Sequence, residues 1–248
     1  MKKNGNRRRG RLIKRFLLGT AGVIFLLAVS VAGFFGLKGY QMYQEAVEER
    51  PISEIVENIR SEEGFTAYDE LPQIYIDAVI AAEDKRFESH WGIDFFAIAR
   101  AAWKDLITLS FKEGGSTITQ QIAKNQLFTQ EKRIERKAAE VFAAFALEKE
   151  CSKKELFEMY VNSIYFGSGY YGIHDAAQGY FGKTPQELTD YECVLLAGLP
   201  NAPSVYSLNN SMELATRRMA VVLERMVKCD KLTAREAEEL LKGNPAGG

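Results

Sequence analysis

The sequence is poor in the residues that build metal centres and disulfide frameworks. Its 248 residues include two histidines and three cysteines, and the cysteines (Cys151, Cys193 and Cys229) are odd in number and far apart. No CxxC pair or Cys/His zinc spacing occurs, and Asp84 with His90 would be too small a ligand set for zinc. We therefore expect single buried thiols without disulfides.

Signature motifs of several enzyme classes are also missing. The chain has no S-x-x-K, no K-T-G (the similar GKTP at 182–185 differs) and no G-x-S-x-G. These absences exclude penicillin-type serine acyl transfer and α/β-hydrolase chemistry. No P-loop or G-x-G-x-x-G is present either, so the sequence contains no signal for nucleotide binding.

Positive charge is scarce outside the N-terminus. The formal net charge is −1, but residues 1–15 carry eight basic side chains and no acidic one, which leaves 24 basic against 33 acidic side chains in the rest. A body with a formal charge of −9 is not expected to bind nucleic acid.

A run of 22 residues without charge, 16–37, follows this basic tail. As a helix it would be roughly 33 Å long, enough to cross the apolar core of a bilayer. The basic cluster before it predicts a cytoplasmic N-terminus and an extracytoplasmic body. A cleaved signal peptide, with small residues at 31–33, is the alternative, but its apolar region would be shorter. We expect a cytoplasmic tail (1–15), an uncleaved anchor (16–37), a stalk broken at Pro51 (38–64) and one domain (65–248).

Helical spacing of apolar residues dominates the domain and predicts a mainly α fold. A glycine-rich aromatic stretch at 164–184 is expected to be looped, and its aromatic rings either stack on sugars or pack within the loop. The expected helices are 75–87, 95–109, one starting near 117, 133–149, 153–163, 189–197, 212–228 and 234–241, the last after a Thr233–Glu236 capping box.

The stretch GGSTITQQIAKN (114–125) could hold an anion. Thr117 and Gln120 fit a capping box, and the free N–H groups of the helical turn that follows favour negative charge. Thr117, Gln121 and Lys124 share one helix face, which would suit a phosphate or a polyhydroxyl ligand. A capped, solvated helix face is the alternative reading.

Two carboxylates stand out for chemistry. Glu140 is the lone charge in an apolar helix, so it should pair with Arg136 and Lys137, four and three residues earlier, or line a cleft. Its pairing would be structural or a mark of a functional site. Glu83 ends an apolar segment and, if it faces the anion site, could act as a proton acceptor. His90 is expected to order the turn after it.

Taken in order, five blocks resemble the signature blocks of the glycosyltransferase family 51 domain, the peptidoglycan glycosyltransferases that polymerise lipid II. The blocks are EDKRFESHWG (83–92), GGSTITQQIAKN (114–125), RKAAEVFAAFALEKECSKKELFEMYVN (136–162), IYFGSGYYGIHDAAQGYFGK (164–183) and LLAGLPNAPSVYSL (195–208).

This resemblance implies a lysozyme-like, two-lobed fold with a large head and a small apolar jaw at the membrane, for which 95–111 is the fitting segment. It also implies inverting β-1,4 transfer with release of undecaprenyl pyrophosphate, in the bacterial cytoplasmic (inner) membrane. Because no transpeptidase domain follows, a monofunctional form is expected, and a truncated bifunctional protein is the alternative. The implied partners are lipid II, the growing glycan, the membrane and other cell-wall synthesis proteins.

The resemblance also assigns roles to residues. Glu83 matches the general base, and Glu140 matches an acid that acts on the donor side, directly or through a divalent cation (Mg or Mn), the one cofactor implied. The chain departs from the family at Lys132, where members usually carry a phosphate-binding arginine; lysine lacks the bidentate geometry. The residues expected to bind substrate are Asp84, Phe87, His90, Thr117, Gln121, Lys124, Asn125, Lys132, Arg136, Lys137 and Asn162.

Two other readings remain. A lysozyme-like lytic enzyme would share the fold and a catalytic glutamate, but it would not need the phosphate-binding cations Lys124, Arg136 and Lys137. A non-catalytic scaffold would be expected to have lost Glu83 or Glu140, and both are present.

Overall fold

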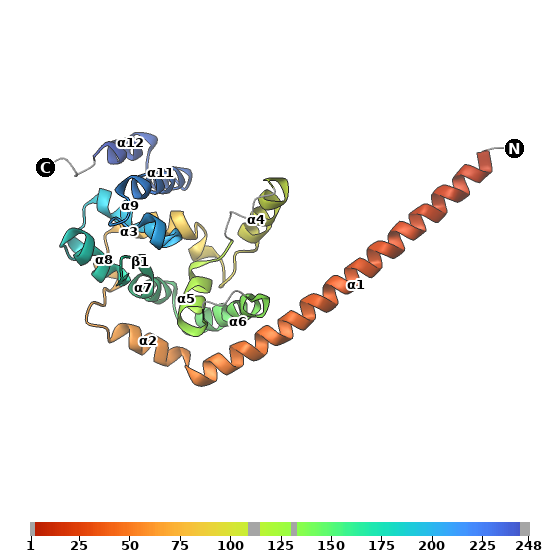
Figure 1. Cartoon of the computed structure of the whole chain (residues 1–248), viewed down its shortest axis with the longest axis horizontal. Helices are drawn as coiled ribbons and strands as arrows, with labels where there is room; N and C mark the ends of the chain where they lie inside the picture. The colour runs from red at the N-terminus through yellow and green to blue at the C-terminus, as the bar shows by residue number, and fades with distance from the viewer. Residues whose placement is uncertain (1–2, 109–114, 130–132, 244–248) are drawn as a thin grey trace.

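The computed structural model describes residues 3–108, 115–129 and 133–243, and the predicted mainly α class is confirmed (Figure 1). A single helix, α1 (Lys3–Glu49), runs away from the body as a long rod. Within the described residues it is the one helix long and apolar enough to cross a membrane, over Leu18–Glu49. The lysozyme-like division into head and jaw stays a prediction.

The C-terminal end of α1 packs against the body (Figure 1). A Cβ at Gly39 would lie 2.5 Å from the Cβ of Ala138 on α6 (Ile134–Glu150), so the two helices approach as closely as their backbones allow. Tyr40 also packs edge-on against Phe142, with ring centroids 5.3 Å apart.

The helix that follows, α2 (Ile52–Arg60), buries three isoleucines in the core. Pro51 separates the two helices, as expected. The segment 38–64, expected to be a stalk, therefore packs against the domain whose start the sequence placed at residue 65.

Two groups of helices build the core. In the first, α3 (Gln73–Glu83), α9 (Asp190–Gly198) and α11 (Met212–Lys228) pack together, with α12 (Ala234–Lys242) on α11. In the second, α5 (Ile118–Leu127) lies between α6 and α7 (Lys153–Ser163). Small alanines on α3 and an almost wholly buried α9 allow these close approaches. The predicted Thr233–Glu236 capping box starts α12.

The sequence predicted a loop at 164–184, and this prediction is wrong. A two-stranded antiparallel ribbon, β1 (Tyr165–Gly167) and β2 (Tyr170–Tyr171), leads into α8 (Gly172–Phe181). Ile173, Ala176 and Ala177 are buried at i, i+3 and i+4, and Gly182 ends the helix with a φ of 65°. The abundant glycine hid this helical pattern.

The helix α3 ends abruptly before the segments that lead to α5. Asp84 leaves helical geometry (φ −154°, ψ 74°), so α3 ends at Glu83, short of the expected residue 87. After it, α4 (Phe95–Thr108) stands apart from the other helices (Figure 1). Its exposed side chains include Phe95, Phe96 and Trp103, consistent with the apolar surface expected there. The shorter elements are η1 (Tyr68–Glu70), η2 (Phe87–Ser89), η3 (Pro185–Glu187), η4 (Leu199–Asn201) and α10 (Pro203–Tyr206).

Candidate functional site

Glu83 lies at the last residue of α3 with its side chain 10% exposed. Its Oε2 accepts a hydrogen bond of 2.8 Å from Nε2 of Gln121 on α5. Its Oε1 is buried without a hydrogen-bond partner among the described residues, and Nη2 of Arg218 on α11 lies 3.9 Å from it. Three helices thus enclose a carboxylate that keeps one oxygen free to accept a proton.

Asp84 points the opposite way, into the start of α5. Its Oδ2 accepts from the backbone N–H of Ile118 (3.0 Å) and lies 2.8 Å from Nε2 of His90. The sequence had suggested that this first turn would hold an external anion. At Ile118 the protein's own carboxylate occupies that place, and His90 orders the turn, as expected.

Thr117 caps α5, and the predicted box with Gln120 is confirmed. Its hydroxyl donates to the carbonyl of Gly92 (2.7 Å) and accepts from the N–H of Gln120 (3.1 Å). The buried hydroxyl is therefore fully engaged inside the protein. In the expected ligand-binding stripe, Gln121 donates to Glu83 and Lys124 is half-buried, and substrate binding by the three residues stays a prediction.

Glu140 is 1% exposed and has the two predicted cations beside it. Nζ of Lys137 donates to its Oε2 at 2.7 Å, and Nε of Arg136 lies 3.3 Å from its Oε1. Two adjacent positive charges compensate the burial of this carboxylate. The sequence prediction of a paired Glu140 is confirmed.

The two carboxylates border the same end of α5. Nζ of Lys137 also donates to Oγ of Ser116 (2.7 Å), just before the Thr117 cap. Ser116 and Glu83 line one small cavity together with Lys85 and Arg100. A chain of contacts therefore runs from Glu140 through Lys137 and Ser116 to the cavity at Glu83.

Of the remaining residues predicted to bind substrate, some are partly exposed to solvent and one lies in the core. Lys124 is half-buried and forms no ion pair within the described part of the chain, and Asn125 beside it is also half-buried. Phe87 is a core residue under Nζ of Lys153, which lies 4.6 Å from its ring centroid. Lys132 lies outside the described residues.

Asn162 has its amide committed within the fold. It accepts from the N–H of Thr66 (2.8 Å) and donates to the carbonyls of Thr66 and Glu158. These bonds attach the 61–67 segment to α7. Its expected contribution to substrate binding stays a prediction.

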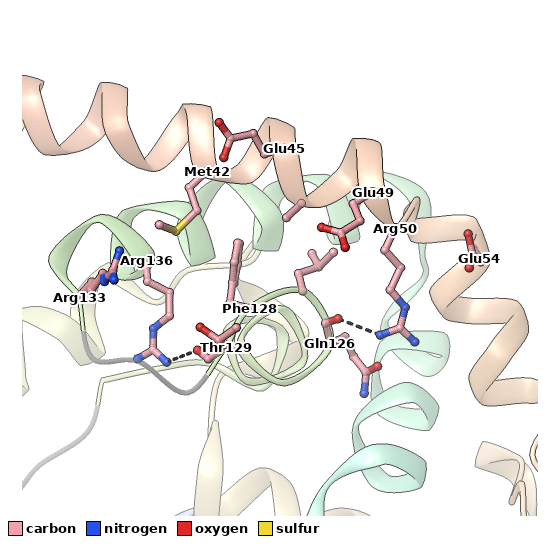
Figure 2. A pocket seen from close by; sticks show the side chains of 12 residues that line it. Met42, Glu45, Glu49, Arg50, Glu54, Gln126, Phe128, Thr129, Arg133 and Arg136 are labelled. Carbon is pink, nitrogen blue, oxygen red and sulfur yellow. Dashed lines mark hydrogen bonds between the residues drawn. The ribbon is translucent and has the colours of Figure 1, made fainter.

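A larger groove lies on the other side of Arg136, where α1 meets α5 and α6 (Figure 2). There Arg136 donates to the carbonyl of Thr129 (3.1 Å) and Arg50 to that of Gln126 (3.0 Å). Both guanidinium groups hold the C-terminal end of α5 in place. Neither Glu83 nor Glu140 lines this groove, so its size does not make it the chemical site.

Two residues near Glu83 were missed by the sequence reasoning. Arg218 is 8% exposed, and burial together with the nearby Arg225 lowers its pKa, while Glu83 opposes that effect. The buried hydroxyl of Tyr160 has no hydrogen-bond partner in the described part of the chain, and burial followed by the Glu83 charge raises its pKa well above the usual value. The signal for Arg218 was present, because it is a lone charge among Ala215, Met219 and Val222 on an apolar helix face.

The surroundings of Glu140 do not fit a divalent cation held by the protein. No group of three or more His, Cys, Asp or Glu side chains suited to a metal occurs in the described ranges. The immediate neighbours of Glu140 are positively charged, which disfavours a second cation there.

Comparison with known proteins gives consistent matches over the region that contains this site. Residues 48–227 match the family model described as Transglycosylase. The chain is 43% identical to Penicillin-binding protein 1A of Neisseria flavescens over 178 residues, 72% of this chain and 22% of that protein. It is 46% identical to Penicillin-binding protein 1A of Vibrio cholerae over 168 residues, 68% of this chain and 20% of that protein.

The chain thus spans about a fifth of the length of these relatives. A crystal structure of Penicillin-binding protein 1A from Haemophilus influenzae aligns with 72% of this chain and 17% of that one, at 24% identity and a TM-score of 0.42.

Proposed function

Because the chain belongs to the transglycosylase family, we propose that it is a peptidoglycan glycosyltransferase that joins lipid II units into glycan strands. One observation carries the proposal most directly. Two buried carboxylates border one helix start, Glu140 between two cations and Glu83 with one oxygen unbonded.

In the proposed reaction Glu83 is the general base. It takes the proton from the 4-hydroxyl of the GlcNAc of the acceptor lipid II while that oxygen attacks C1 of the donor chain's MurNAc. The bond from C1 to the diphosphate breaks, undecaprenyl pyrophosphate leaves with its electron pair, and the new β bond forms with inversion. The unbonded Oε1 of Glu83 has the lone pairs that this proton requires.

The cations beside the cleft would stabilise the charge that builds on the leaving group. Lys124 forms no ion pair in the described structure. Lys137 contacts Glu140 and is still half exposed. A diphosphate would therefore meet charged donors without breaking the fold. A lytic enzyme that cuts a neutral glycan would have no use for them, which favours the synthetic reaction.

Divalent cations are assigned to the substrate in this proposal. Because the residues around Glu140 do not fit a metal of their own, Mg²⁺ or Mn²⁺ would arrive bound to the diphosphate. No step of the reaction is routed through a metal.

The apolar part of α1 would anchor the protein in the bacterial cytoplasmic (inner) membrane. The eight basic residues before it support an orientation with the N-terminus in the cytoplasm and the domain outside. The lipid-linked substrate and the growing glycan would then meet the site at the membrane surface.

The test is incubation of the full-length protein in detergent or vesicles with labelled lipid II, with Mg²⁺ or with a chelator. The wild type should convert lipid II into polymer. Glu83→Gln should lower turnover by about 10²–10⁴-fold, the usual contribution of a general base. Its melting temperature should stay close to the wild-type value, because the amide oxygen can still accept from Gln121.

Glu88→Gln, an exposed position five residues further on, is the matched control and should keep full activity. Polymerisation by Glu83→Gln would remove the base assignment. Release of soluble fragments from purified cell wall, without consumption of lipid II, would favour a lytic enzyme instead.

A further inference from the structure

Two arginines on one face of α11 reach the C-terminal end of α3. Arg225 donates to the backbone carbonyl of Ala82, and Arg218, two turns earlier, extends toward Glu83. Nε of Arg218 donates to the carbonyl of Gly198 on α9 (3.3 Å), and a Cβ on that glycine would lie 3.1 Å from Cγ of Arg218. The absence of a side chain at Gly198 thus lets the arginine pass between α9 and α11.

The two facing atoms form a loose pair. Nη2 of Arg218 lies 3.9 Å from Oε1 of Glu83, beyond hydrogen-bond distance, and the described residues offer neither buried atom a hydrogen-bond partner. Charges at this separation in a poorly solvated place still attract strongly. Glu140, by contrast, has a cation within 2.7 Å. The Arg218 geometry places a positive charge opposite Glu83 and leaves its Oε1 without a hydrogen bond from the described residues.

We propose that Arg218 is a positioning residue for Glu83: its positive charge faces this carboxylate and orients it between α3, α5 and α11 without touching substrate. The inference rests on the proposed role of Glu83 as the base. This role explains why an apolar face of α11 carries a buried guanidinium. Burying such a charge costs free energy that packing contacts alone would not offset.

Other charged and titratable groups around Glu83 remain in place in the variants below. The hydroxyl of Tyr160 approaches from α7, and burial raises its pKa so that it stays neutral in the working pH range. Asp84 adjoins Glu83 in the chain, and the charges of Tyr160 and Arg218 interact with it; Tyr75 neighbours Tyr160, and Tyr206 and Arg225 neighbour Arg218. Lys85, Asp94 and Arg100 line the adjoining cavity.

The experiment measures lipid II polymerisation by full-length Arg218→Met and Arg218→Lys across pH. Removal of the positive charge should make Glu83 take up a proton more readily. The acid limb of the pH–kcat profile of Arg218→Met should therefore move up by roughly one pH unit. Its KM should stay within twofold, since the arginine does not bind substrate. Arg218→Lys keeps the charge and should keep the acid limb at the wild-type pH.

The matched control is Arg217→Met, the adjacent residue on α11, which is exposed and pairs with Glu213 on the surface. Its profile should equal that of the wild type. An unmoved acid limb in Arg218→Met, or a raised KM with unchanged kcat, would overturn the proposal. Loss of folding in both Arg218 variants would show a purely structural role, with the same consequence.

The design separates this inference from the proposed function. An inactive wild type would remove both. An active wild type with an inactive Glu83→Gln and an unshifted Arg218→Met would remove only the role of Arg218.

Discussion

Glu83 and Glu140 are two carboxylates whose neighbouring residues suit them to different chemical roles. Glu140 has a lysine and an arginine within 3.3 Å, so its negative charge is compensated inside the protein. Glu83 has one amide hydrogen bond and a more distant guanidinium, so one of its oxygens remains unbonded. The first arrangement suits a fixed charge beside a leaving group, and the second suits a group that must take up a proton.

Lys124→Ala tests the leaving-group site at the level of one residue. Because Lys124 has no ion pair to lose in the described structure, the melting temperature should hardly change. A lost charge-assisted phosphate contact of about 1.5–3 kcal/mol should raise KM for lipid II at least about tenfold. Steady-state kinetics check this, with Lys149→Ala, an exposed lysine on α6, as control. Unchanged KM and kcat would contradict the assignment.

The residue pairs that the sequence predicted are those close along the chain. Arg136, Lys137 and Glu140 fall on one helix face by their spacing, and the Thr117–Gln120 box follows from four consecutive letters. The pairs that it did not predict join distant segments, such as Asp84 with Ile118 and Glu83 with Arg218. No local pattern encodes these contacts, because they depend on how α3, α5 and α11 pack.

At the scale of elements, local pattern located most helices and failed where two signals conflicted. The long helices α6, α7 and α11 lie where apolar spacing placed them. In 164–184, glycine and tyrosine indicated a loop, yet three buried apolar residues form a helix there. Tertiary burial outweighed the weak local preference of glycine.

The contact between α1 and α6 can be tested at its narrowest point. Gly39→Val would place a branched side chain against Ala138, whose Cβ and carbonyl carbon lie 2.5 and 2.9 Å from the new Cβ. We expect the free energy of unfolding to fall by about 1–3 kcal/mol, the usual cost of overpacking. Activity should fall as well, because α6 carries Glu140.

Gly36→Val, three residues earlier, has no atom within 4 Å of its new Cβ and carries the same intrinsic helix cost. It should match the wild type in thermal unfolding and in polymerisation. Equal effects of the two substitutions would show that the close helix contact is unimportant.

At the scale of the whole molecule, anchor and domain are joined without a flexible connection. Deletion of residues 1–37 would remove the apolar part of α1 but keep the turns that pack against α6. We expect this shortened protein to stay folded. It should lose more activity on membrane-embedded lipid II than on a short-chain, water-dispersed analogue, and parallel assays of the two substrates check this. Equal losses would mean that the apolar segment contributes structure and not access to the membrane.

The length of α1 links bilayer thickness to the orientation of the site. A helix whose apolar run exceeds the local hydrocarbon thickness tilts to bury it. The helix α1 continues unbroken from Lys3 to Glu49 and packs closely against α6 at Gly39. A tilt of α1 would therefore rotate α6, which carries Glu140, together with it. A thinner or thicker membrane would then turn the candidate site toward or away from the lipid headgroups, so lipid composition would change the rate of the proposed reaction without any contact between lipid and site.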